Sequence, residues 1–182
     1  MERKPPARLT QEIYFWLQTF TIGLVAVILV FTFLGRPVVV DGDSMLPTLS
    51  HGDVMLVRQV GYTPQQGDVV VLTKYFEDVT GPIVKRVIAT AGQTVEIDYA
   101  GNTVTVDGVV LEEDYTLEPM VQGSWQTITS ITVPEGCVFV MGDNRNISND
   151  SRNPALGAVD TRYILGQAVA VLLPPAHVGE IS

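Results

Sequence analysis

Three segments of the sequence carry side chains that could take part in a reaction. Ser44 lies in the segment 42–49 (GDSMLPTL), among glycine, aspartate and proline. Lys85 lies in the apolar segment 83–88 (IVKRVI). The segment 142–152 (GDNRNISNDSR) is a dense series of polar residues that follows an apolar run. A serine and a lysine could act together, the first as a nucleophile and the second as its base.

Lys85 is the candidate base because its neighbours predict a buried strand. Side chains alternate along a strand, so Ile83, Lys85 and Val87 share one face. Burial strips water from an ammonium group, which lowers its pKa and favours the neutral amine that a general base requires. A lysine at a sheet edge that reaches water is the alternative interpretation. Arg86 cannot be the base, because a guanidinium group does not deprotonate in proteins.

The other possible bases and nucleophiles fit less well. A Ser-His-Asp triad needs a histidine, but His51 lies in a turn seven residues after Ser44, and His177 lies in a proline-rich C-terminal tail. Cys137 opens an apolar strand with no polar neighbour that would lower its pKa, so we expect it to pack in the core. A Ser-Lys pair is therefore favoured over a Ser-His pair. Taken alone, Ser44 would more often form a turn or cap a helix.

The polar segment 142–152 predicts a hydrogen-bonded loop. Asp143 and Asp150 are plausible carboxylate partners for Arg145 or Arg152. Such pairs hold a loop together more often than they catalyse, and an ordinary surface loop is the alternative interpretation.

The start of the chain predicts a membrane anchor. Residues 14–34 are 21 uncharged, mostly apolar residues, which as a helix would span roughly 31 Å, the thickness of a bilayer core. Three basic residues precede this run and one follows it closely, so the positive-inside rule places the N-terminus in the cytoplasm. We expect a cytoplasmic tail at 1–13, a transmembrane signal-anchor helix at 14–34 and an extracytoplasmic domain at 35–182. A cleaved signal peptide and a buried core helix are the alternatives.

The remainder of the chain predicts a mostly β, antiparallel catalytic domain. Short β-branched runs alternate with turn residues, and Asp107-Gly108 and Gly101-Asn102 are typical of tight hairpins. Residues 99–135 are rich in acids and less regular, so we expect a small insertion or cap there. The expected strands are Val54–Val57, Asp68–Leu72, Ile83–Ile88, Thr94–Ile97, Thr103–Val106, Val109–Leu111, Ser130–Val133, Val138–Met141 and Ala168–Leu172.

The composition excludes several classes of protein. Of the 182 residues, 46% are hydrophobic and 17% charged, which is incompatible with a disordered chain. The net charge of −9 argues against nucleic acid as a partner, because phosphate binding depends on lysine and arginine. One cysteine allows no intramolecular disulfide or cysteine-based zinc site, and two histidines leave little room for a metal centre.

The three polar segments, in this order behind one anchor, resemble those of the bacterial type I signal peptidases, also called leader peptidases. The short form typical of Gram-positive bacteria fits best. GDSMLPTL matches the nucleophile box of that family, VKRVIA its lysine box and GDNRNISNDSR its C-terminal box. GDVVVL at 67–72 is similar to a further box between the first two. After Lys85, the segment 89–93 keeps only Gly92 of the usual Gly-x-Pro-Gly-Asp stretch.

The resemblance implies a role for each residue of the site. Ser44 would be the nucleophile and Lys85 the general base, with the Ser148 hydroxyl orienting the amine. Asp143 and Arg152 would form a structural ion pair supported by Asp150. Some members carry a serine at the position of Gly42, so here the oxyanion hole would rest on backbone N–H groups in the Gly42 region, that of Ser44 among them.

The resemblance also implies a substrate and a mechanism. The protein would remove signal peptides from exported preproteins by acyl transfer, cleaving after small residues in an Ala-x-Ala pattern, with no cofactor and no metal. Its expected partners are signal peptides, the lipid bilayer and the secretion translocon, and its expected location is the cell membrane, with a single pass. Shallow apolar substrate pockets would be lined by Val38, Val40, Met45, Leu49, Ile83 and Val84.

Two other functions compete with this one. Self-cleaving Ser/Lys proteases related to SOS-response repressors share the Ser-Met element and a β core, but they carry a DNA-binding domain where this chain has its apolar run. A catalytically silent, membrane-anchored binding module is the second alternative. The joint presence of Ser44, Lys85 and Ser148 argues against it.

Overall fold

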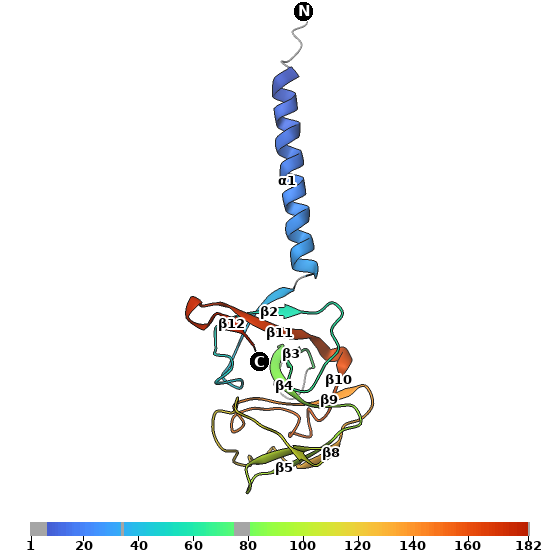
Figure 1. Cartoon of the computed structure of the whole chain (residues 1–182), viewed down its shortest axis with the longest axis vertical. Coiled ribbons are helices and arrows are strands. Elements are labelled where there is room, and N and C mark those ends of the chain that lie inside the picture. The colour runs from blue at the N-terminus through green and yellow to red at the C-terminus, as the bar shows by residue number, and fades with distance from the viewer. Residues whose placement is uncertain (1–6, 34, 75–80, 182) are drawn as a thin grey trace, which may run out of the picture.

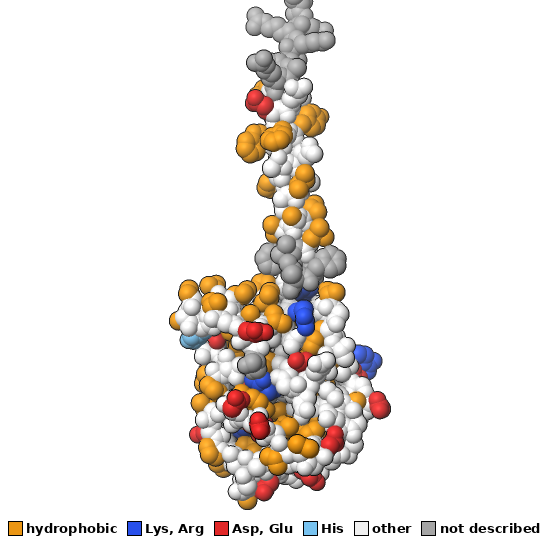
Figure 2. All heavy atoms as spheres, in the orientation of Figure 1, with side chains coloured by type: hydrophobic (Ala, Val, Ile, Leu, Met, Phe, Trp, Pro, Cys, Tyr) orange, Lys and Arg blue, Asp and Glu red, His pale blue; other side chains and the backbone are white. Residues whose placement is uncertain are grey.

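One long helix precedes an all-β domain in the computed structural model, which describes residues 7–33, 35–74 and 81–181. Helix α1 (Ala7–Phe33) stands away from the domain in Figure 1. Its segment Leu9–Leu29 is long and apolar enough to cross a membrane, and none of the most apolar stretch is buried by the rest of the protein. Figure 2 shows hydrophobic side chains along this helix. The helix begins seven residues before the uncharged run at 14–34, whose last residue lies outside the described part of the chain.

An eight-stranded antiparallel sheet forms the part of the domain nearest to α1 (Figure 1). Its strands follow the order β1-β2-β11-β3-β4-β9-β10, and β12 pairs with β11. Their bounds are β1 (Arg36–Val39), β2 (Val54–Arg58), β3 (Val69–Leu72), β4 (Ile83–Thr90), β9 (Cys137–Met141), β10 (Val159–Asp160), β11 (Ile164–Leu173) and β12 (Gly179–Glu180). Short 3-10 helices lie at Thr161–Tyr163 and Pro175–His177.

A second, four-stranded antiparallel sheet lies at the end of the domain away from α1 (Figure 1). Its order is β7-β6-β5-β8. The strands are β5 (Thr94–Asp98), β6 (Thr103–Val106), β7 (Val109–Val110) and β8 (Ser130–Thr132). The segment 99–135 therefore supplies three of these four strands and is built into the second sheet.

The mostly β, antiparallel fold expected from the sequence is confirmed. Each of the nine predicted runs contains a strand, and the structure adds the short strands β1, β10 and β12. Asp107 and Gly108 have φ angles of 52° and 79°, which is the geometry of a tight hairpin turn. The alternation of small apolar residues and turn residues was sufficient to predict this class of fold.

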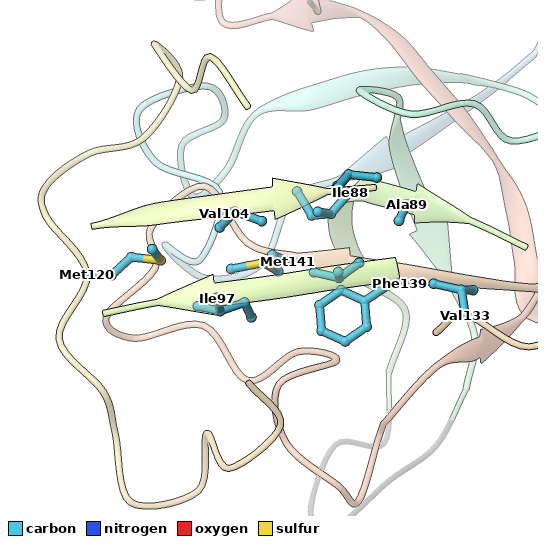
Figure 3. Close-up of a cluster of buried hydrophobic side chains, with 10 residues drawn as sticks. Ile88, Ala89, Ile97, Val104, Met120, Val133, Phe139 and Met141 are labelled. Carbon is cyan, nitrogen blue, oxygen red and sulfur yellow. The ribbon is translucent and has the colours of Figure 1, made fainter. Parts of the chain in front are cut away.

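Two apolar clusters connect the sheets to the functional segments. The first packs β4 and β9 against the second sheet around Phe139, which is fully buried, and Figure 3 shows these side chains pointing toward one another. The second lies under the segment 40–49 and includes Val40, Met45 and Leu49 together with residues of β2, β3 and β11. The loop that carries Ser44 is thus fixed to the core by its own apolar side chains.

Phe139→Ala should strongly destabilise the fold. The substitution leaves a cavity in the cluster between the sheets, so we expect the free energy of unfolding to fall by about 3–5 kcal/mol. Urea unfolding of the full chain in detergent, followed by circular dichroism, measures this change. Val109→Ala on the exposed strand β7 is the control, and an equal loss in both variants would contradict the assignment of the core.

Candidate active site

The strand pairing brings Lys85 to the start of the polar loop. In β4, Lys85 lies opposite Val70 of β3, and the next residue, Arg86, lies opposite Met141 at the end of β9. Gly142, which opens the loop 142–152, follows directly after Met141. Two segments that are far apart in the sequence therefore meet at one place in the sheet.

Ser44 and Lys85 are in hydrogen-bond contact. Ser44 lies in a turn after β1, is half-buried, and its Oγ is 2.8 Å from Lys85 Nζ. Nζ also donates to the carbonyl of Val84 at 2.9 Å. These two bonds hold the amine in one position beside the serine hydroxyl.

Lys85 is buried, with 3% of its surface exposed. Burial disfavours the charged ammonium and lowers the pKa of Lys85 to about 8. The carboxylates of Asp150 and Asp143 act in the opposite direction, and Arg152 adds to the lowering. A substantial fraction of this amine is consequently neutral near pH 8, which is the form that can accept a proton.

The nucleophile turn, which is the turn that carries the predicted nucleophile Ser44, is held through its backbone by the loop 142–152. Asn144 N–H donates to the carbonyl of Ser44 at 3.1 Å, and its side-chain amide donates to the carbonyl of Asp43 at 3.2 Å. Asn144 is itself almost fully buried. The loop 142–152 thus fixes the turn directly, in addition to the apolar contacts beneath it.

The ion pairs of the site differ from the predicted one. Asp143 does not pair with Arg152. It forms a bidentate pair with Arg86, whose Nε and Nη2 donate at 2.9 and 2.8 Å. Arg152 pairs with Asp150 instead, at 2.8 Å from both Nε and Nη2. The reason is the register of β4 and β9, which brings Arg86 opposite Met141, only two residues before Asp143.

The two buried ion pairs support different parts of the site. Thr48 Oγ1 donates to Asp143 Oδ2 at 2.5 Å, so the Arg86 pair reaches the nucleophile turn. Gly142 N–H donates to Asp150 Oδ2 at 3.0 Å, so the Arg152 pair holds the first residue of the loop. Burial raises the pKa of Asp150, but hydrogen bonds and charge from Arg152 outweigh it and hold that pKa below its ordinary value.

Ser148 is fully buried and lies beside Gly142. A Cβ atom on Gly142 would collide with the Ser148 hydroxyl and would come within 2.5 Å of the Ser44 carbonyl oxygen. Glycine at 142 therefore leaves room for the Ser148 side chain and the Ser44 carbonyl to pack against it. The hydrogen-bond acceptors of Lys85 Nζ are Ser44 and Val84, so Ser148 lies near the amine's site without bonding to it in this structure.

One of the backbone donors expected around Gly42 is already engaged in a hydrogen bond. Gly42 N–H already donates to His51 Nδ1 at 3.1 Å. Ser44 N–H donates to none of the residues that the structure describes. The neighbouring N–H groups of Asp43 and Met45 likewise donate to none of the described residues, so the serine N–H is available as a donor together with those beside it.

The chain as a whole matches the family model "Signal peptidase, peptidase S26" over residues 13–173. It belongs to the signal peptidase S26 family. As a member, it is a serine endopeptidase of the signal peptidase I type, which removes signal peptides. The family match excludes the assignment of this chain to the self-cleaving repressor-related proteases. Because the chain is a serine endopeptidase, it is not a catalytically silent binding module.

Relatives of this signal peptidase are found in several bacteria. "Probable signal peptidase I-1" of Synechocystis sp. is 38% identical over 170 residues, which cover 88% of this chain and 83% of the relative. "Signal peptidase I P" of Bacillus subtilis subsp. natto is 37% identical, covering 87% of this chain and 88% of the relative. A crystal structure of a signal peptidase I from Enterococcus faecalis V583 aligns with 58% of this chain and 97% of its own at 32% identity, with a TM-score of 0.47.

The six apolar residues that were expected to line substrate pockets differ in how much of their surface is exposed. Val40, Met45 and Leu49 are buried in the core, with at most 3% of their surface exposed. Val38, Ile83 and Val84 are half-buried. The turn directs its apolar side chains inward, so only the second group offers surface to a substrate.

Two residues of the site were not found from the sequence. Thr48 was overlooked although it is a second hydroxyl in the nucleophile segment. Arg86 was considered only as a base and rejected. The available signal was that Arg86 follows a lysine in a strand predicted to be buried. Side chains alternate along a strand, so Arg86 lies on the face opposite Lys85. A guanidinium group buried on that face needs a carboxylate partner.

Asp143→Asn should destabilise this signal peptidase markedly. Arg86 would stay buried without a carboxylate, and breaking such a pair costs about 3–5 kcal/mol. Urea unfolding in detergent measures the loss. The control is Asp160→Asn, which breaks the solvent-exposed pair with Arg162 and should leave stability unchanged. Similar unfolding curves for both variants would contradict a structural role for the buried pair.

Proposed function

We propose that Ser44 and Lys85 form a Ser/Lys catalytic dyad that cleaves the signal peptide by acyl transfer. The observation that carries the proposal is the 2.8 Å contact between Ser44 Oγ and a buried lysine amine whose pKa is lowered to about 8. A neutral amine at that distance can accept the hydroxyl proton. The ion pairs and Asn144 hold both partners in this geometry.

The reaction proceeds in two halves. In the first, the Ser44 proton passes to Lys85 Nζ as Oγ bonds to the scissile carbonyl carbon, and the resulting oxyanion accepts a hydrogen bond from Ser44 N–H. The carbon–nitrogen bond then breaks, and the Lys85 ammonium returns the proton to the leaving amine of the mature protein. In the second half, the neutral Lys85 accepts a proton from water as the water oxygen bonds to the acyl carbon. The ester bond to Ser44 Oγ then breaks, the Lys85 ammonium returns the proton to Oγ, and the signal peptide leaves with a free carboxyl group.

The substrate lies as an extended strand beside the start of β4. Ile83–Lys85 pair with β3 on one edge, whereas β9 joins β4 only from Arg86 onward. The other edge of these three residues, which include Lys85, has no strand partner in the described part of the chain. An extended peptide can add to such an edge through backbone hydrogen bonds.

We further propose that cleavage follows small residues in an Ala-x-Ala pattern. Val38, Ile83 and Val84 are the partly exposed members of the expected pocket set, and Val38 and Val84 pack against the buried cluster of Val40, Met45 and Leu49. A shallow surface backed by a close-packed core has little depth for a large side chain. This accounts for a preference for alanine at the positions that face it.

The apolar helix fits a membrane anchor, and we propose that it spans the bilayer once. Basic residues at 3, 4 and 8 precede the uncharged run 14–34 of this helix, which favours a cytoplasmic N-terminus and an extracytoplasmic catalytic domain. Lipid is then a permanent partner of α1. The secretion translocon stays a predicted partner on the strength of the family resemblance.

Ser44→Ala and Lys85→Met should each abolish processing of an Ala-x-Ala preprotein by the detergent-solubilised full chain. The first removes the nucleophile and the second removes the base. The matched control is Lys74→Met, since Lys74 bonds to the carbonyl of Leu156 away from the dyad, and it should process at the wild-type rate. Mass spectrometry of the products maps the cleaved bond. Processing by either dyad variant at the wild-type rate would eliminate the mechanism.

The pH dependence should report the ionisation of Lys85. Only the neutral amine is active, so log kcat/KM should fall with unit slope below about pH 8. Half of the amine is neutral at a pH equal to its pKa, so between pH 8 and pH 6 the expected loss is about 50-fold. A profile that stays flat down to pH 6 would show that the lysine is not the base.

A further inference from the structure

A short part of the segment 99–135 reaches the catalytic loop. Both oxygens of Glu113 contact Arg145, at 3.0 Å from Nη1 and 2.6 Å from Nη2. Tyr115 OH donates to Glu113 Oε1 at 3.1 Å. The Tyr115 ring lies 4.0 Å from the guanidinium carbon of Arg86 and 5.9 Å from that of Arg145. Glu113 and Tyr115 thus both contact Arg145 within the loop 142–152, and Tyr115 also contacts Arg86 of β4.

Arg145 connects Glu113 to the residue that contacts the nucleophile turn. Its Nε donates to the carbonyl of Gly142 at 3.0 Å. Gly142 is packed directly against Ser148 and the Ser44 carbonyl, as its lack of space for a Cβ shows. The backbone carbonyl of Arg145 accepts further bonds from Arg152 at 2.7 Å and from Gln126 at 3.1 Å. Arg145 is consequently the centre of the loop's internal bonding.

The position of Arg145 depends on a nearby negative charge. Its side chain is fully buried, and Glu113 is its ion-pair partner within the described residues. A buried guanidinium that loses its carboxylate is costly, so it moves toward water or another acid. The Glu113 oxygens also fix the direction of the guanidinium fork, because a bidentate pair has one preferred geometry. Without them, the bond from Nε to Gly142 would no longer be held in place.

We propose that Glu113 is a positioning residue for the catalytic loop, holding Arg145 and through it the Gly142 backbone against Ser44 and Ser148. The inference rests on the proposed Ser44–Lys85 dyad. Tyr115 supports Glu113 through its hydroxyl, and burial raises the pKa of that hydroxyl, which keeps it a proton donor. The acidic segment therefore contributes to turnover from outside the three motifs.

Glu113→Gln in the full-length protein tests this role, with Glu112→Gln as the matched control. Glu112 is exposed and adjacent, so both variants remove one negative charge from the same place in the chain. We expect kcat on an Ala-x-Ala preprotein to fall at least tenfold in Glu113→Gln, with KM changed less than twofold. The midpoint of the pH profile should stay at its wild-type value, because the charges acting on Lys85 are Asp150, Asp143 and Arg152. Glu112→Gln should match the wild type throughout.

A purely structural role makes a different prediction. It would lower the unfolding temperature of Glu113→Gln but leave kcat unchanged wherever the variant is folded by circular dichroism, and that result would overturn the proposal. The comparison holds whichever residue is the nucleophile. An active Ser44→Ala enzyme would defeat the proposed dyad, whereas an unchanged kcat in Glu113→Gln would defeat only the positioning role.

A second pair of variants tests whether Glu113 acts on the loop through Arg145. The same pair also tests the proposal if Glu113→Gln does not fold. Arg145→Gln leaves the Glu113 carboxylate with its bond from Tyr115, whereas the double variant Glu113→Gln/Arg145→Gln removes both charges of the pair. If Glu113 acts through Arg145, the two should have kcat values within twofold of each other. A further tenfold loss in the double variant would show that Glu113 acts by another route and would contradict the proposal.

Discussion

The site depends on the removal of one lysine amine from water. Lys85 Nζ is enclosed by the sheet, bonded to Ser44 Oγ and the Val84 carbonyl, and carries a lowered pKa because of its burial. Burial of a lysine is unfavourable unless neighbouring structure enforces it. Three parts of the structure keep Lys85 buried here. They are β3 on one edge of β4, the loop after β9 and the apolar cluster under the nucleophile turn.

Buried ion pairs provide the rigid support for that amine. The Arg86–Asp143 pair reaches the nucleophile turn through Thr48, and the Arg152–Asp150 pair holds Gly142. Paired charges of this kind add little net stability, but they specify one arrangement, because breaking either partner leaves an uncompensated charge inside the protein. The loop can therefore place two carboxylates near Lys85 without leaving the lysine paired to either of them.

The sequence predicted the fold class and brought the correct segments together, but not the details of their contacts. Turn residues and β-branched runs are local signals, so the strands and the 107–108 hairpin were found. The partner of Asp143 was not found, since Arg86 is 57 residues away and only the register of β4 and β9 brings them together. Burial of Met45 and Leu49 was missed for a similar reason, because the direction of a turn's side chains is set by the core beneath it. Glu113 was one of several acids in the segment 99–135, which the sequence predicted only as a small insertion or cap.

The adjacent placement of Lys85 and Arg86 has a consequence for how much β4 can change. Neighbouring residues on a strand serve opposite faces, so a slip of β4 by one position against β3 would exchange the ammonium for the guanidinium. The group facing the serine would then be one that cannot lose its proton. In the proposed mechanism, an inserted or deleted residue that forced such a slip would therefore remove the base, and the buried apolar side chains of β4 would change faces with it.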